Sequence, residues 1–303
     1  MKALVTGASG FVGKHLVGLL KQSGDDVIET DVISGGPDLK DLKGLTDLIG
    51  DTAPEVIFHL AGQADVKHSW DDVFGTFKSN SEGTLNILVA SRSSGNARVV
   101  TVTSADIYGI VNSDDLPVNE TNPLKPTSPY SASKAAADLL ALQAFLGYGQ
   151  EVVRARSFNH IGPGQSEKFV CSALAARIAY NEINQISELS IGNSVARRDF
   201  TDVRDVVRAY RLLAINGKAG EAYNVCTGSS ISIETIANKL LDLSTHSMKL
   251  VIDESLLRPV DLMDLQGDPS KIQEDTGWVP EFSLDQTLSD LLEYWRSQVS
   301  LAE

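Results

Sequence analysis

The chain has 303 residues, of which 42% are hydrophobic and 22% charged, and its formal net charge is -14. This composition is typical of a soluble globular protein with one large or two modest domains. The negative charge argues against a nucleic-acid or anionic-membrane binder, because a phosphate surface would repel it. The two cysteines, Cys171 and Cys226, show no metal-ligand spacing, and no apolar run is long enough to span a bilayer. We therefore expect a cytoplasmic protein without a metal site.

Strands and helices alternate through the first half of the chain. The expected strands are 2–6, 26–32, 55–61, 98–104 and 151–158, and the expected helices are 11–23, 41–49, 73–94 and 130–147. This rhythm predicts an α/β fold with a doubly wound parallel sheet, of the Rossmann type, covered by helices on both faces. Ligand sites in such sheets lie at the carboxyl ends of the strands.

After Phe158 the rhythm breaks. We expect a Gly/Pro loop at 159–165, a loop with a short strand at 187–200, and a further short strand at 221–227. The expected helices are 169–181, 202–215, 233–244, 268–277 and 284–298. A smaller α/β unit should close over the carboxyl edge of the sheet. The predicted division gives a dinucleotide-binding domain, 1–158 plus about 196–226, and a substrate domain, 159–195 plus 227–303.

A glycine-rich turn follows the first strand and opens the first helix. In VTGASGFVG, Gly7 permits a tight turn, Gly10 lets backbone approach a pyrophosphate, and Gly13 lets helix and sheet pack closely. Backbone N–H groups at the helix start, including those of Phe11 and Val12, can then bind phosphate oxygens. The spacing is GxxGxxG, but its place between strand and helix predicts a dinucleotide site, for NAD(H) or NADP(H).

An acidic residue follows the second strand about 20 residues further on, where such residues bind the adenosine ribose hydroxyls. Asp31 best fits this position, although Glu29 competes for it, and either would disfavour the 2′-phosphate of NADP(H). Asp38 and Leu39 are candidate adenine contacts, with a solvated acid beside a core leucine as the alternative.

The motif SPYSASK places Tyr130 and Lys134 one turn apart on a helix that begins at Pro129. An ammonium beside a phenol favours the phenolate, so we expect Lys134 to lower the pKa of Tyr130 and to bind the nicotinamide ribose. Ser104 ends the fourth strand, where its hydroxyl can hold a substrate oxygen. These three residues form a set for hydride chemistry between a carbonyl and an alcohol.

Many motifs in order resemble the extended short-chain dehydrogenase/reductase family that modifies nucleotide sugars. They are TGASGFVG, HLAGQADV (59–66), NSEGTLNIL (80–88), TSADIYG, YSASK, RSFNHIGPGQ (156–165), RRDFTDVRDV (197–206) and RPVDLMDLQGDPSKI (258–272). The resemblance implies that Ser104, Tyr130 and Lys134 are catalytic. It also implies that Leu60, Ala61 and Asn80 lie at the cofactor.

The same resemblance places Arg198 and Arg258 at the substrate diphosphate, which guanidinium forks suit. As alternatives, Arg198 pairs with Asp199 and Asp202, and Arg258 is a solvated cation. Asn159 is expected at the sugar site. His160 is equally a sugar-site or a structural residue, and His59 is expected to be structural.

The dipeptide after Ser104 bears on the reaction. Sugar-nucleotide dehydratases of the family usually carry an Asp-Glu pair there, whereas this chain has Ala105 and Asp106, so one carboxylate remains. The expected reaction is NAD(P)H-dependent reduction of the 4-keto group of a GDP-4-keto-6-deoxy sugar, giving a GDP-6-deoxyhexose such as GDP-rhamnose. Asp106 then positions a sugar hydroxyl or is a turn acid.

Two alternatives remain, namely an NAD-dependent nucleotide-sugar 4-epimerase with the same residues and a non-catalytic dinucleotide-binding regulator. Family members commonly dimerise through two long helices, so a homodimer through 73–94 and 130–147 is expected. Leu139, Leu140 and Leu142 would be buried in that interface or inside the chain.

Overall fold

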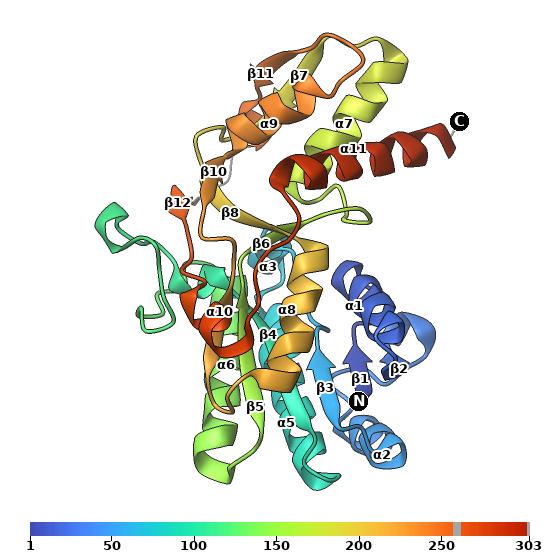
Figure 1. Ribbon diagram of the computed structural model, residues 1–303, viewed down its shortest axis with the longest axis vertical. Helices are drawn as coiled ribbons and strands as arrows, with labels where there is room; N and C mark the ends of the chain where they lie inside the picture. Colours follow the sequence, from blue (N-terminus) through green and yellow to red (C-terminus); the bar gives the residue numbers. More distant parts are fainter. Residues whose placement is uncertain (257–261, 302–303) are drawn as a thin grey trace.

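The computed structural model of the protein describes residues 1–256 and 262–301. A parallel six-stranded sheet in the order β2-β1-β3-β4-β5-β9 forms its larger part (Figure 1). The strands are β1 (Lys2–Thr6), β2 (Asp26–Thr30), β3 (Val56–His59), β4 (Arg98–Ser104), β5 (Val152–Ser157) and β9 (Ala222–Val225). The predicted doubly wound parallel sheet is confirmed.

Helices cover both faces of this sheet. Neighbouring residues of a strand point to opposite sides, so each strand contributes side chains to two separate cores. Val5 of β1 packs in a core with side chains of α1 (Phe11–Gln22) and α8 (Val203–Asn216). Leu4, its neighbour, packs in a second core with side chains of α2 (Leu42–Thr52), α5 (Gly83–Ser93) and α6 (Pro129–Tyr148). Strands buried on both faces are mostly apolar, as VIFH in β3 is. The two arginines of VVRARS in β5 are buried, and both pair with Asp138.

The segment predicted as one long helix at 73–94 is divided. After the short α3 (His68–Asp71) come α4 (Val73–Phe77), a π-helical turn at Lys78–Glu82 and α5. Asp72 caps α4 by accepting the Gly75 N–H at 2.8 Å. A π turn admits one extra residue per turn and is frequent at functional sites, and this one carries Asn80.

The second strand ends at Thr30, two residues earlier than predicted. Asp31 follows with extended backbone and caps the 3₁₀ turn η1 (Val32–Ser34) by accepting the Ile33 N–H at 3.0 Å. The carboxylate therefore begins a turn at the carboxyl edge of the sheet.

A smaller unit lies beyond the carboxyl edge, in the upper part of Figure 1. β8 (Arg197–Asp202) pairs with β10 (Ser230–Ser232), β12 (Asp264–Leu265) and β6 (Asn159–Ile161), and β7 (Glu188–Ile191) pairs with β11 (Lys249–Ile252). Side chains of α7 (Val170–Asn184), α9 (Ile233–Asp242) and α11 (Leu284–Leu301) form its core. Turns at Ala105–Tyr108 (η3), Ser113–Asp115 (η4) and Glu254–Leu256 (η5) and helix α10 (Ser270–Thr276) complete the described elements.

The chain first passes from the large sheet into the smaller unit after β5. The prediction of a loop at 159–165 is wrong for its first residues, because 159–161 form β6 and pair with β8. Three residues carry too little periodicity to distinguish a strand from a loop, and the pairing partner is far away in sequence. The chain thus runs from the carboxyl end of β5 directly into the smaller sheet, which brings that sheet to the ligand edge.

Candidate active site

The glycine turn between β1 and α1 has the geometry of a phosphate cradle. Gly7 has a φ of +70°, and a Cβ there would lie 2.8 Å from the Ala61 nitrogen. A Cβ at Gly13 would collide with the Gly7 carbonyl and the Ala8 backbone. Gly10 is the N-cap residue of α1, so it leaves the first N–H groups of this helix without a side-chain acceptor. These features fit a dinucleotide pyrophosphate, which needs close backbone approach and a helix N-terminus.

Asp31 lies beside this cradle. Its Oδ2 accepts the Ser9 N–H at 3.2 Å, and its Oδ1 accepts the Ile33 N–H. A single carboxylate thus joins the glycine turn to the end of β2, and its charge is held where an adenosine ribose would be bound in such a fold.

The remaining predicted cofactor contacts surround the same edge. Asp38 is exposed and pairs with Lys40 at 3.7 Å, while Leu39 packs in the core beneath α5 and would contact a Cβ at Gly83. The Ala61 N–H donates to Thr6 Oγ1 at 3.2 Å, and Leu60 packs on the core of the α1 face. The structure therefore places Leu60 and Ala61 against the glycine turn and Asp38 on the surface.

Asn80 fastens the loop after β3 to helix α6. Its Oδ1 accepts the Gln63 N–H at 2.8 Å, and its amide donates to Gln63 O at 3.0 Å and to Ser133 Oγ at 2.9 Å. A Cβ at Gly62 would lie 3.7 Å from Lys134 Nζ. The π turn therefore brings Asn80 and the loop into contact with the helix that carries Tyr130 and Lys134.

Ser104, Tyr130 and Lys134 meet at the carboxyl end of β4. Helix α6 begins with a capping box between Ser128 and Ser131, and Pro129 occupies its first turn. Lys134 Nζ donates to Val102 O at 3.1 Å, and the Ser104 side chain lies close enough to Tyr130 to lower the pKa of its phenol. Tyr130 and Lys134 are both buried.

The prediction that Lys134 lowers the pKa of Tyr130 is wrong for the isolated chain. Burial raises the pKa of the phenol, the negative charge of Asp106 raises it further, and the hydrogen bond from Ser104 lowers it only in part. Burial also lowers the pKa of Lys134 to about 8. Burying a charged phenolate costs more free energy than the expected attraction to the Lys134 ammonium provides, so the phenol stays protonated at neutral pH.

Asp106 and Asn159 lie on two loops at this edge. Asp106 stands in the 3₁₀ turn η3, and its N–H donates to Ser104 Oγ at 3.2 Å. Asn159 begins β6, where it pairs with Phe200, and its side chain is exposed. Asp106 is thus next to Ser104, whereas the Asn159 side chain faces away from the core.

The side chains of His59 and His160 both form hydrogen bonds within the protein. His59 bonds Thr6 Oγ1 at 3.0 Å and Thr84 Oγ1 at 3.1 Å, and burial and the charge of Lys134 lower its pKa to about 3. It therefore stays neutral and joins β1, β3 and α5. His160 bonds Phe158 O at 3.2 Å and stacks on Phe11, with 6.1 Å between ring centroids, so it connects the smaller unit to the start of α1.

The predicted substrate arginines are placed in part. Arg198 lies on β8 and donates to Arg197 O at 2.7 Å and Leu262 O at 2.6 Å. The neighbouring Asp199 is buried and accepts N–H groups of Thr227 and Gly228, at 2.8 and 2.9 Å. Arg258 lies outside the described residues.

A buried ionic network under the site was not predicted. Asp138, one turn beyond Lys134 on α6, pairs with Arg154 at 2.6 Å and with Arg156 at 2.9 Å. Arg156 also donates to Tyr108 OH, which donates to Asn224 Oδ1 at 2.7 Å. The sequence feature that could have indicated this network is the four-residue spacing of Tyr130, Lys134 and Asp138, which places all three on one helix face.

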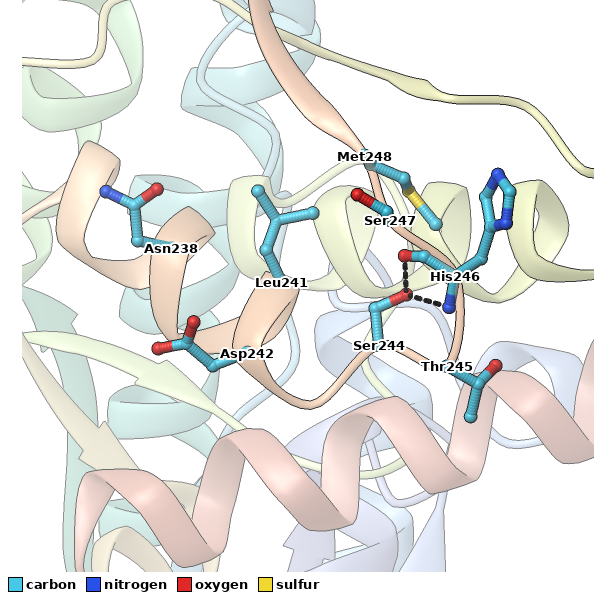
Figure 2. Close-up of a pocket in the computed structure, with 8 residues that line it drawn as sticks. All are labelled: Asn238, Leu241, Asp242, Ser244, Thr245, His246, Ser247 and Met248. Carbon is cyan, nitrogen blue, oxygen red and sulfur yellow. Dashed lines mark hydrogen bonds between the residues drawn. The ribbon is translucent and has the colours of Figure 1, made fainter.

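Among the described residues, no group of three or more His, Cys, Asp or Glu side chains could hold a metal ion, and no helix has the length and apolar character of a membrane span. A hollow of about 440 Å³ lies where α9 is followed by 244–248 (Figure 2). Ser244 Oγ, which accepts the His246 N–H and donates to His246 O, stabilises its wall. None of the candidate active-site residues lines this hollow.

Comparison with known proteins gives consistent results. The family model described as GDP-mannose 4,6-dehydratase matches residues 4–291. GDP-6-deoxy-D-mannose reductase of Pseudomonas aeruginosa is 37% identical over 98% of both chains. The structure of RMD from Pseudomonas aeruginosa complexed with NADPH has a TM-score of 0.90 at 35% identity, covering 98% of this chain and 100% of that one. UDP-glucose 4-epimerase of Thermotoga maritima, solved with UDP-glucose, has a TM-score of 0.91 at 28% identity, covering 99% and 100%.

Proposed function

Because this chain belongs to the GDP-mannose 4,6-dehydratase family of extended short-chain dehydrogenases/reductases, NAD(P)-dependent enzymes of nucleotide-sugar chemistry, we propose that it reduces the 4-keto group of a GDP-4-keto-6-deoxy sugar. The product is a GDP-6-deoxyhexose such as GDP-rhamnose. The reductase of Pseudomonas aeruginosa, at 37% identity over nearly the full length, supports this reaction.

One observation carries the proposal. Ser104 and Tyr130 lie close together beside Lys134, while Ala105, which is buried, stands where a second carboxylate would serve dehydration. With one acid, Asp106, the site lacks the acid/base pair that elimination of water requires. It keeps the hydroxyls that carbonyl reduction requires.

The residues have distinct parts in this reaction. The nicotinamide, when bound, supplies the hydride that C4 of the sugar receives. Tyr130 gives its proton to the oxygen on C4, which balances the charge that the hydride brings. Ser104 would hold that oxygen by a hydrogen bond, and Lys134, whose side chain is anchored on Val102 O, would bind the nicotinamide ribose.

The cofactor and the substrate occupy adjacent parts of the carboxyl edge. Gly7, Gly10 and Gly13, with the N–H groups of Phe11 and Val12, would hold the pyrophosphate of NAD(H) or NADP(H). Other contacts would come from Asp31, Asp38, Leu39, Leu60, Ala61 and Asn80. The substrate would bind through Asp106, Asn159, Arg198 and Arg258.

We divide the work between two domains. Residues 1–158 and about 196–226 would bind the dinucleotide, and residues 159–195 and 227–303 the nucleotide sugar. The packing of α8 on the parallel sheet supports the first assignment. Ile272 and Trp278 pack on the same core, so this part of the second domain anchors it on the first.

We also propose a homodimer formed through α4, α5 and α6. Both α4 and α5 contact α6, and the three helices expose Val73, Phe74, Phe77, Leu85, Leu139 and Leu146, with Phe74 83% exposed. Of the three leucines named from the sequence, Leu139 is exposed, whereas Leu140 packs on the core.

The free thiols Cys171 and Cys226 are consistent with a reducing cytoplasm.

The test mixes purified protein with GDP-4-keto-6-deoxymannose and NADH or NADPH, and follows the near-ultraviolet absorbance of the reduced nicotinamide. Oxidation matched by formation of a GDP-6-deoxyhexose supports the proposal. Tyr130→Phe should slow it by about 100-fold or more, whereas Tyr180→Phe, on an exposed face of α7, should not. Failure to oxidise either cofactor contradicts the reductase assignment, and sugar interconversion without net oxidation indicates a 4-epimerase.

A further inference from the structure

A buried arginine on β5 connects the helix α6 to the turn η3. Arg156 makes two parallel bonds to Asp138 of α6, from Nε to Oδ1 at 3.1 Å and from Nη2 to Oδ2 at 2.9 Å. Its remaining nitrogen, Nη1, donates to the hydroxyl of Tyr108 in η3 at 3.1 Å. The three side chains are between 0 and 4% exposed. A planar guanidinium with a fixed arrangement of donors therefore holds α6 and η3 together away from water.

This connection lies between the segments that carry the predicted catalytic residues. On α6, Tyr130 and Lys134 lie about two turns and one turn before Asp138. Ser104 stands immediately before η3, as its N-cap residue. Thr103, the residue before the serine, donates to Asp138 Oδ1 at 3.5 Å. The segment that carries the serine is thus held on one carboxylate of α6 from both ends, directly on one side and through the guanidinium on the other.

Charge balance alone does not require this arginine. Arg154, two residues earlier on β5, pairs with Asp138 Oδ2 at 2.6 Å, and one guanidinium is enough to neutralise one carboxylate. A second buried cation has a desolvation cost that only good geometry and further hydrogen bonds offset. Arg156 makes those bonds, because its Nη1 reaches both Tyr108 and the backbone carbonyl of Glu120, the latter at 2.9 Å. The contacts that distinguish Arg156 from Arg154 therefore lie on the side of the serine segment.

Resting on the proposed function, we propose that Arg156 is a positioning residue that sets the serine segment against α6, so that Ser104 and Tyr130 meet the same substrate oxygen. Reduction needs both hydroxyls within hydrogen-bond reach of one atom, and a displacement of about 1 Å can cost about 100-fold in rate. The hydroxyl of Tyr108 is itself fixed, because it accepts from Arg156 and donates to Asn224 Oδ1 at 2.7 Å. Arg156 acts through the two segments that it joins, and it is not a catalytic group.

The first test is the steady-state kinetics of keto-sugar reduction on folded protein. Arg156→Lys keeps the charge but loses the donor fork that contacts Asp138 and Tyr108 together. We expect kcat to fall by about tenfold or more, with KM for the reduced nicotinamide within about twofold of wild type. Arg154→Lys is the matched control, because this arginine shares the strand and the carboxylate but places its other bond on Gly220 O. An unchanged kcat in Arg156→Lys, or an equal loss in both variants, overturns the proposal.

A double-mutant cycle with Ser104→Ala separates positioning from a general weakening of the fold. If Arg156 acts by placing the serine, its replacement should cost little once the serine hydroxyl is absent. The kcat of the double variant should then lie within about threefold of that of Ser104→Ala alone. Tyr108→Phe loses only the hydroxyl that Arg156 contacts, so it should lower kcat less and show the same non-additivity, and it decides the question if Arg156→Lys does not fold. Losses that multiply in the double variants overturn the proposal.

The two proposals fail in different ways. If the wild-type chain reduces no keto sugar with either cofactor, the proposed function fails, and crystal structures of wild type, Arg156→Lys and Arg154→Lys still test the positioning role. We expect the distance between Ser104 Oγ and the Tyr130 hydroxyl oxygen to change by about 0.5 Å or more in Arg156→Lys and to keep its wild-type value in Arg154→Lys. An unchanged distance in Arg156→Lys overturns the positioning role.

Discussion

The amide of Asn80 donates a 2.9 Å hydrogen bond to Ser133 Oγ, which joins the π turn after α4 to the helix that carries Tyr130 and Lys134. Oδ1 of the same side chain accepts a hydrogen bond from the Gln63 N–H. A single buried asparagine therefore links the loop after β3 to the helix that carries Tyr130 and Lys134.

Replacing Asn80 by alanine should weaken both the fold and the activity. The Gln63 N–H and Ser133 Oγ would each lose a partner, at a cost of about 1–3 kcal/mol in the free energy of unfolding. Loss of kcat should exceed what reduced folding explains, because the loop against Lys134 is released. Chemical denaturation and kinetics on folded protein check this, with Gln150→Ala, which removes one buried bond to Leu88 O just before β5 begins, as the control. Equal effects of the two variants on kcat would contradict this linking role.

Much of this arrangement is readable from the sequence. The alternation of apolar strands and helices predicts the parallel sheet, and a sheet of this kind brings Gly7, Ser104 and Asn159 to one edge wherever they lie in the chain. Local signals suffice because Gly7 directly follows a strand, Ser104 ends one, and Asn159 comes two residues after one. The SPY segment equally defines the first turn of α6.

Other features depend on contacts that local patterns do not contain. The π turn at Asn80 is specified by hydrogen bonds to Gln63 and Ser133, which a helical periodicity cannot reveal. The protonation of Tyr130 depends on how deeply it is buried, and that depth is set by the whole fold. The short strands β6, β10 and β12 exist because β8 pairs with them, so they have no signature of their own.

Asp31 should make the enzyme prefer NADH to NADPH. Its carboxylate is held beside the glycine turn by the Ser9 N–H, where it opposes a 2′-phosphate. Asp31→Asn should improve kcat/KM for NADPH relative to NADH by about fivefold, because two unit charges about 4 Å apart in water interact by about 1 kcal/mol. Asp38→Asn, an exposed acid paired with Lys40, is the matched control. A wild-type preference for NADPH that the Asp31 variant does not change would show that this carboxylate lies away from the ribose.

The exposed side chains of α4 and α6 should hold two copies together. Phe74→Glu places a charge in the middle of this apolar surface, so it should dissociate a dimer at micromolar concentration while the chain stays folded. Sedimentation with circular dichroism measures both properties. Ile252→Glu makes the same change at an exposed position of β11 in the smaller unit and should leave the dimer intact. A monomeric wild-type protein would remove this interface.

Lys134 should make stability depend on pH in the alkaline range. Burial lowers its pKa from 10.5 in the unfolded chain to about 8 in the folded one. Between these values the unfolded chain binds more protons, so the free energy of unfolding should rise with pH, by at most about 1.4 kcal/mol per pH unit. Lys134→Met removes this titration, so the stability of wild type relative to this variant should increase from pH 8 to 10.5 and level off above it. Chemical denaturation across this range measures the difference, and Lys239→Met, which removes an exposed lysine paired with Asp285, should show no such trend. A wild-type advantage that falls as pH rises would mean that the folded protein stabilises the ammonium, and the buried position of Lys134 would then be energetically favourable to its charge.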